Sequence, residues 1–185
     1  MRSLQNSFEY LDFILSLRSL AAQRGLECVA EGVENADIVD TLGSASELLL
    51  QGYAFAKPMS AQALSDWLKR KAEGQAMGPF PQSLHGWYCR HVDRFVSIGN
   101  ALYAAPDLIS IEHLQDAERC PLHAMIPHIG GDGEIEAAHR QWHANYARFT
   151  SMIQAGATAG ELWHAMESCK QELRKLVERK LRSKR

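Results

Sequence analysis

The stretch LHGWYCRHVDRFVSIGNAL, residues 84–102, decides the fold of the larger part of this chain. Within it, mostly apolar residues recur at alternating steps of four and three, which places them in one stripe along a helix. The stripe consists of Leu84, Tyr88, His91, Phe95, Ile98 and Leu102. Pro106 is expected to close this helix, because proline cannot continue one. The position of His91 in the stripe predicts that its side chain points into the protein interior.

The sequence after residue 102 predicts further helices. A short helix is expected at Ile109–Arg119, a turn or two at Cys120–Ile126, and a longer helix at Ile135–Gln154. A last helix repeats the steps of four and three with Leu162, Met166, Cys169, Leu173 and Leu176. Several amphipathic helices with short connections are typical of an antiparallel bundle.

The sequence before residue 73 has a different pattern. The predicted order is a helix at residues 6–24, a strand at Cys28–Ala30, a helix capped by Asn35, a strand at Leu48–Leu50, and a helix capped by Ser60. Such alternation indicates parallel α/β structure. The fold class is therefore mixed, with an α/β segment followed by an all-α bundle.

Residues 73–82, EGQAMGPFPQ, contain two glycines and two prolines and show no periodicity. They are predicted to link a first domain at residues 1–72 to a second at residues 83–185. The distribution of histidine supports this division, because all eight histidines lie after residue 84.

Composition excludes several classes of protein. The net charge of −2 recruits neither nucleic acid nor acidic lipid, and no apolar run reaches the roughly 20 residues of a membrane span. The basic stretch at residues 170–185 has no interleaved aromatic residues to stack on bases, which favours a solvated terminus. Four scattered cysteines do not form a disulfide framework. We expect a cytoplasmic protein.

Four residues of the second segment could hold one metal ion. His139 and His143 are four residues apart, so their imidazoles share one face of a predicted helix. The ring nitrogens of an interior His91 need a partner, either a hydrogen bond to backbone or water, or a metal ion. Cys120 lies just before a break in the helical pattern, where a thiolate can face the bundle. Three imidazoles and one thiolate make a closed tetrahedral set that suits Zn²⁺.

The segment from Leu84 to Ile153 resembles the chemoreceptor zinc-binding (CZB) domain. The resemblance is carried by the sequences His-Val-Asp-Arg-Phe from His91, Cys-Pro-Leu-His from Cys120 and His-Arg-Gln-Trp-His from His139. It implies a helical bundle that signals through zinc or oxidant, with His91, Cys120, His139 and His143 as ligands.

The other histidines receive separate predictions. His85 is the alternative first ligand, because it precedes Trp87 on the same helix. His123 stands where the CZB family has glycine. His123 and His128 are interpreted as solvated loop residues, either of which can substitute as a ligand. His113 and His164 are interpreted as surface residues.

In the first segment, Glu31 and Gln51 each follow a predicted strand, where parallel α/β folds gather catalytic groups. Alternatively, Glu31 caps a helix and Gln51 is an ordinary loop residue. The sequences Val29–Glu34 (VAEGVE) and Gln51–Pro58 (QGYAFAKP) resemble the closing part of EAL domains, which are cyclic di-GMP phosphodiesterases on a TIM-like barrel. The resemblance implies that Glu31 serves the metal site or its attacking water and that Gln51 lies at the same barrel end.

The family's Glu-Ala-Leu triplet, paired aspartates and catalytic lysine are expected before this match, and the chain lacks them. Mg²⁺ or Mn²⁺ and cyclic di-GMP are therefore expected only with an intact EAL domain, and this chain is predicted to be inactive. The resemblances together imply a zinc-binding regulatory module, attached to a partial EAL domain, that tunes cyclic di-GMP signalling. The alternatives are a fragment of an active phosphodiesterase with catalytic residues upstream of Met1, and a bundle whose histidines bind nothing. A homodimer is also compatible with the sequence.

Overall fold

The computed structural model describes residues 8–45, 47–72, 81–105 and 108–183. In chain order the elements are α1 (Phe8–Gln23), β1 (Cys28–Ala30), α2 (Ala36–Gly43), β2 (Leu48–Leu50), α3 (Ala61–Ala72), α4 (Leu84–Ala104), α5 (Ile111–Gln115), the short 3-10 helix η3 (Ala117–Arg119), α6 (Gly133–Gln154) and α7 (Ala159–Ser183). The described chain is therefore mostly helical, with one small sheet.

The sheet consists of β1 and β2, which pair in parallel with Ala30 opposite Leu50. Both strands have the bounds that the sequence predicts. The connection between them is α2, whose start is fixed by Asn35, because its side-chain oxygen accepts the Ile38 N–H at 3.0 Å. The segment is thus a parallel crossover with its helix on one side.

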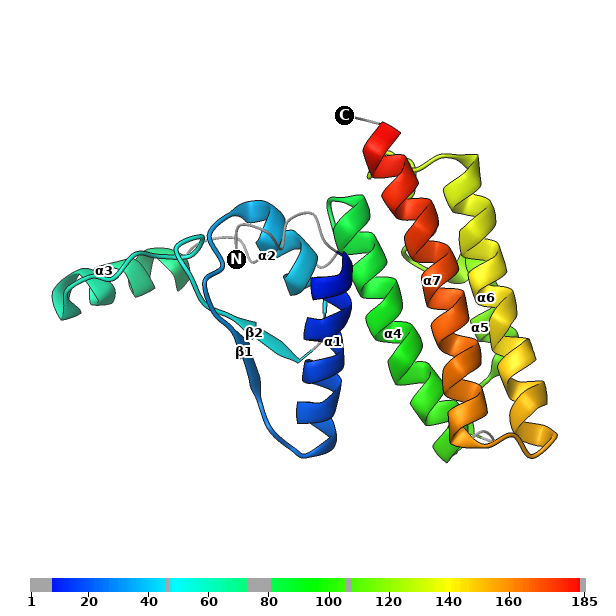
Figure 1. Ribbon diagram of the computed structural model, residues 1–185. Coiled ribbons are helices and arrows are strands. Elements are labelled where there is room, and N and C mark those ends of the chain that lie inside the picture. Colours follow the sequence, from blue (N-terminus) through cyan, green and yellow to red (C-terminus); the bar gives the residue numbers. More distant parts are fainter. Residues whose placement is uncertain (1–7, 46, 73–80, 106–107, 184–185) are drawn as a thin grey trace.

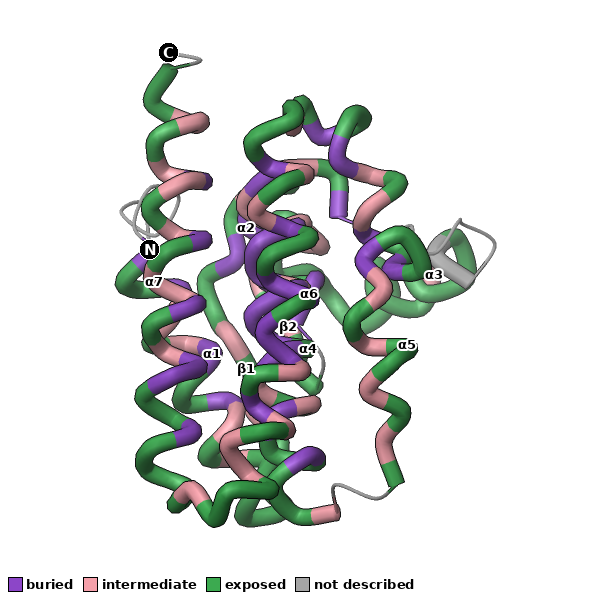
Figure 2. The backbone as a smooth tube through the Cα atoms, turned by 90° about the vertical axis from the view of Figure 1, so that its right-hand side faces the viewer, coloured by how far each residue is buried: buried purple, intermediate pink, exposed green. Residues whose placement is uncertain are grey.

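Much apolar surface of this segment faces solvent. The outward side of α1 exposes four aromatic and aliphatic side chains, those of Tyr10, Phe13, Leu17 and Leu20. Each strand also exposes one residue, Val29 in β1 and Leu49 in β2. Helix α3 projects away from the other elements (Figure 1), and none of its described side chains is buried (Figure 2).

The larger part is a bundle of α4, α6 and α7, with α5 against α6. Figure 1 shows α4 between α1 and the other bundle helices, and Figure 2 shows buried residues running along α4 and α6. The core is rich in aromatic side chains, and the rings of Phe95 and Trp142 lie 4.1 Å apart between their centres. These two helices form the wall on which the candidate site is built.

The prediction of one continuous helix at residues 109–119 is wrong. Two short helices, α5 and η3, occupy this range instead. The reason is local, because Asp116 leaves helical geometry and its carboxylate accepts the Glu118 N–H at 3.1 Å, which starts a new turn. The adjacent helix α4 ends at Ala104, and Pro106 lies outside the described residues.

The two parts are joined by polar contacts at α4 and at the residues just before it. Of the predicted linker, residues 73–80 lie outside the described residues, whereas the Gln82 N–H donates to Asp40 of α2 at 2.7 Å. The Tyr88 hydroxyl donates to Asp12 of α1 at 3.2 Å. Among the described helices, none has the length and apolar character needed to cross a bilayer.

Candidate metal centre

Four side chains that the sequence singles out as ligands lie together in the bundle. His91 lies on α4, Cys120 directly follows η3, and His139 and His143 lie on α6. Each offers one donor atom, and the four atoms lie within 4.8 Å of one another. All four residues are buried, and His139 is fully inaccessible. Residues up to 52 positions apart in sequence therefore meet at one point.

The geometry fits one ion after a small adjustment. Bonds of 2.0–2.1 Å to nitrogen and 2.3 Å to sulfur place tetrahedral ligand atoms roughly 3.3–3.8 Å apart. The widest separation of 4.8 Å needs a closure on the order of 1 Å.

Two of the imidazoles already have their Nδ1 atoms occupied. His91 Nδ1 lies 3.1 Å from the Trp87 carbonyl oxygen, and His143 Nδ1 lies 2.5 Å from that of Leu114. A carbonyl only accepts, so each Nδ1 carries the proton and donates it. The Nε2 atom of each neutral ring is then left with a free lone pair. For His91 this atom is buried and has no hydrogen-bond partner in the described structure.

His139 is held differently. Its Nδ1 lies 3.1 Å from Nδ1 of His123, and its Nε2 is buried without a hydrogen-bond partner among the described residues. The interpretation of His123 as a solvated loop residue is wrong, because its side chain is only 15% exposed. The compact run of turns after Cys120 brings it back onto α6. The sequence contains no periodic signal for this contact, since His123 lies outside any helix.

The position of Cys120 is fixed by the loop that follows it. The indole N–H of the buried Trp87 donates to the Leu122 carbonyl at 3.0 Å, which ties this loop to α4. Trp87 also contacts His91, with ring centres 4.1 Å apart. One tryptophan therefore positions donors from two segments.

Burial keeps the imidazoles neutral. It lowers the pKa of His91 to about 3 and, aided by neighbouring imidazoles, that of His139 to about 2. The pKa of His143 is also lowered, again mainly by burial. Neutral imidazole is the form that binds metals. The site is thus ready to bind at its nitrogens without releasing protons from them.

The thiol differs. Burial raises the pKa of Cys120, although backbone hydrogen bonds from Leu122 and His123 and the charge of Arg94 oppose this. A metal ion must therefore displace the thiol proton, which makes affinity dependent on pH.

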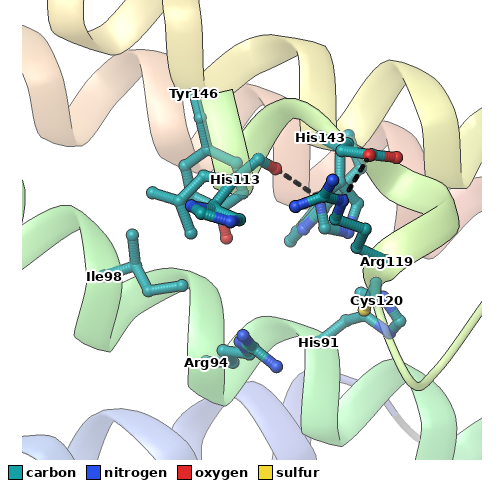
Figure 3. Close-up of a pocket in the computed structure, with 11 residues that line it drawn as sticks. His91, Arg94, Ile98, His113, Arg119, Cys120, His143 and Tyr146 are labelled. Carbon is teal, nitrogen blue, oxygen red and sulfur yellow. Dashed lines mark hydrogen bonds and ion pairs between the residues drawn. The ribbon is translucent and has the colours of Figure 1, made fainter. Parts of the chain in front are cut away.

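A cavity of about 40 Å³ adjoins the cluster, with room for two or three water molecules. Figure 3 shows His91, Cys120 and His143 at one end, and Arg94 and Arg119 beside them. Because both arginines are exposed, this cavity provides a route between the donors and solvent.

The remaining predicted residues lie elsewhere. His85 stacks on Phe8 of α1, with ring centres 5.0 Å apart, and does not belong to the cluster. Exposed positions are taken by His113, His128 and His164. Glu31 and Gln51 are exposed at the same end of the strand pair, immediately after Ala30 and Leu50.

No family model, curated protein or solved structure matches this chain. Its chemistry must therefore be inferred from its own residues.

Proposed function

We propose that the helical bundle is a zinc-binding sensor module that regulates the α/β segment joined to it. The observation that carries this proposal is the donor set of three buried imidazoles and one thiol. Two imidazoles have Nδ1 committed to a carbonyl, and two Nε2 atoms are buried without a partner. A buried polar atom without a partner costs free energy, and a shared cation removes that cost at several atoms together.

The donor types favour zinc. Three nitrogens and one sulfur form a closed tetrahedral set, whereas catalytic zinc keeps a position open for water. When bound, zinc supplies charge and a fixed geometry that joins α4, α6 and the loop at Cys120. This role agrees with the resemblance of residues 84–153 to CZB domains.

The same donor set suits a signal that is either zinc supply or oxidant. Occupancy depends on free zinc and on loss of the Cys120 proton. A two-electron oxidant converts the thiolate to sulfenic acid, which removes the sulfur as a ligand. Loss of that bond frees the loop around Cys120 from the other three ligands.

For the α/β segment, we propose the closing part of an EAL-type barrel, through which the module tunes cyclic di-GMP signalling. Glu31 and Gln51 follow parallel neighbouring strands at one edge, as that resemblance requires. Two-metal hydrolysis needs several converging carboxylates. Of the groups assigned from the resemblance, Glu31 is the one carboxylate, so the 185-residue chain with Mg²⁺ or Mn²⁺ is expected to leave cyclic di-GMP intact.

Metal analysis of the purified chain tests the sensor proposal. We expect about one zinc ion per chain after zinc loading and removal of excess metal. Cys120→Ala should lose most of this zinc, because three neutral nitrogens bind zinc more weakly than a set that includes a thiolate. Cys169→Ala is the matched control, because Cys169 is also buried but lies on α7 outside the cluster. A wild-type chain that binds no zinc, or a Cys120→Ala variant with unchanged affinity, would contradict the proposal.

A further inference from the structure

Two residues outside the ligand set extend the candidate centre to the protein surface. His123 Nδ1 lies 3.1 Å from His139 Nδ1, and His123 Nε2 lies 3.2 Å from a carboxylate oxygen of Glu118. The second oxygen of Glu118 accepts hydrogen bonds from Arg140 at 3.1 Å (Nε) and 3.0 Å (Nη2). A continuous chain of contacts thus runs from an exposed ion pair to a buried candidate ligand.

The position of each ring proton in this chain follows from elementary chemistry. The carboxylate of Glu118 lies 3.2 Å from His123 Nε2, and its negative charge favours the tautomer of the neutral ring that carries its proton on that nitrogen. His123 Nδ1 is then an acceptor. The facing atom, His139 Nδ1, must therefore donate, and the single proton of a neutral His139 is used there. Its Nε2 is left with a free lone pair.

This outcome matches the burial of His139. Its Nε2 is inaccessible and lacks a hydrogen-bond partner among the described residues, while the cluster requires one donor atom from this ring. With the opposite tautomer, a buried N–H would point at the other ligands and could not bind a cation. His91 and His143 obtain the same tautomer from backbone carbonyls, whereas His139 lies mid-helix with no such carbonyl partner for its ring in the described structure.

We propose that His123, oriented by Glu118, is a positioning residue that sets the tautomer of His139 and thereby raises the zinc affinity of the centre. This inference rests on the proposed function, since it assumes that the four donors bind zinc. Arg140 takes part by fixing Glu118, and it does so with an exposed pair that contributes little to stability by itself. A residue that hydrogen-bonds the other ring nitrogen of a metal-binding histidine is worth about 10–100-fold in metal affinity.

The test compares the zinc affinity of four proteins by competition with a chelator. His123→Ala removes the acceptor and should weaken binding about 10-fold or more. His123→Asn places an amide oxygen near the position of Nδ1, and should restore binding to within about threefold of the wild type. The matched control is His128→Ala, because His128 is an exposed histidine of the same loop that contacts the Ala124 carbonyl. It should bind as the wild type does.

A second measurement does not depend on how well a variant folds. Long-range ¹H–¹⁵N correlation spectra of the zinc-loaded wild type report which nitrogen of His139 carries the proton, and we expect Nδ1. A proton on Nε2, equal affinity of His123→Ala and wild type, or equal weakening by His123→Ala and His123→Asn would each overturn the inference. These results are distinct from failure of the zinc proposal itself, in which the wild type binds no zinc and the affinity comparison has no signal.

Discussion

At the scale of single residues, the candidate centre is a set of neutral imidazoles that the fold keeps from being protonated. An ordinary histidine has a pKa near 6.5, whereas burial lowers the pKa of His91 to about 3 and that of His139 to about 2. The metal-free protein holds these rings in water-poor surroundings without the compensation that charge or a metal would give. Its stability must therefore depend on pH.

We predict that the metal-free protein loses stability as the pH falls below about 6.5. The unfolded chain binds protons at its histidines from that pH downward, while the folded chain does not until far lower pH, so protonation favours unfolding. At pH 5.5, His91 and His139 each cost about 1.4 kcal/mol relative to pH 7.5, and the lowered pKa of His143 acts in the same direction. The urea midpoint at the two pH values measures this. His139→Gln should have a shallower dependence, and an equal midpoint at both values would contradict the burial argument.

Sequence spacing predicts the placement of some residues of the candidate centre but not of others. The four-residue step from His139 to His143 predicts a shared helix face, and the stripe position of His91 predicts an interior side chain; the structure confirms both. The contact between His123 and His139 has no such signature. It depends on the path of the turns after Cys120, which is set by tertiary contacts such as that of Trp87 with Leu122.

At the scale of elements, helix caps and helix breaks explain which helix boundaries can be predicted from the sequence and which cannot. Asn35 marks the start of α2 because its side chain satisfies a free N–H group, and such a cap is visible in sequence. The division of residues 109–119 into α5 and η3 was missed, because Asp116 permits a helix but also favours a new start. The sequence pattern of α3 predicts a helix, but it does not predict that this helix projects away from the other elements.

The parallel pair depends on one close approach, at Gly52. A Cβ at this position would lie 2.1 Å from the Val33 carbonyl oxygen and 2.4 Å from its nitrogen. Backbone atoms cannot give way as a flexible side chain can, so Gly52→Ala should destabilise the α/β segment by about 3 kcal/mol. Hydrogen exchange measures this at the Gln51 amide, which donates to the Ala30 carbonyl at 2.9 Å.

Gly133→Ala provides the control for this substitution, because a Cβ there meets no atom within 4 Å. Exchange at Gln51 should be faster in Gly52→Ala and unchanged in Gly133→Ala, while zinc binding by the bundle is retained in both. Unchanged protection of Gln51 in Gly52→Ala would show that the strands do not approach as closely as described.

At the scale of the whole molecule, α4 is the element that the two parts share. It carries His91 toward the candidate centre, and its residues Asp93 and Tyr88 contact α1. The ion pair of Arg18 with Asp93 is buried on both sides. A change in the position of α4 that follows metal binding would therefore reach α1 directly, which is the helix that leads into β1.

This ion pair provides a test of the coupling between the parts. Among the described residues, Asp93→Ala leaves the buried guanidinium of Arg18 with Glu47 as its one carboxylate partner, 3.8 Å away and largely exposed, so it should cost about 3–5 kcal/mol in urea unfolding. The double variant Arg18→Met, Asp93→Leu removes both charges and should recover most of that loss. Arg182→Ala is the control, because the Arg182 side chain is 83% exposed and its ion pair with Glu178 should be worth under about 1 kcal/mol. If Asp93→Ala unfolds as the wild type does, the pair is not desolvated, and α1 cannot follow α4 through it.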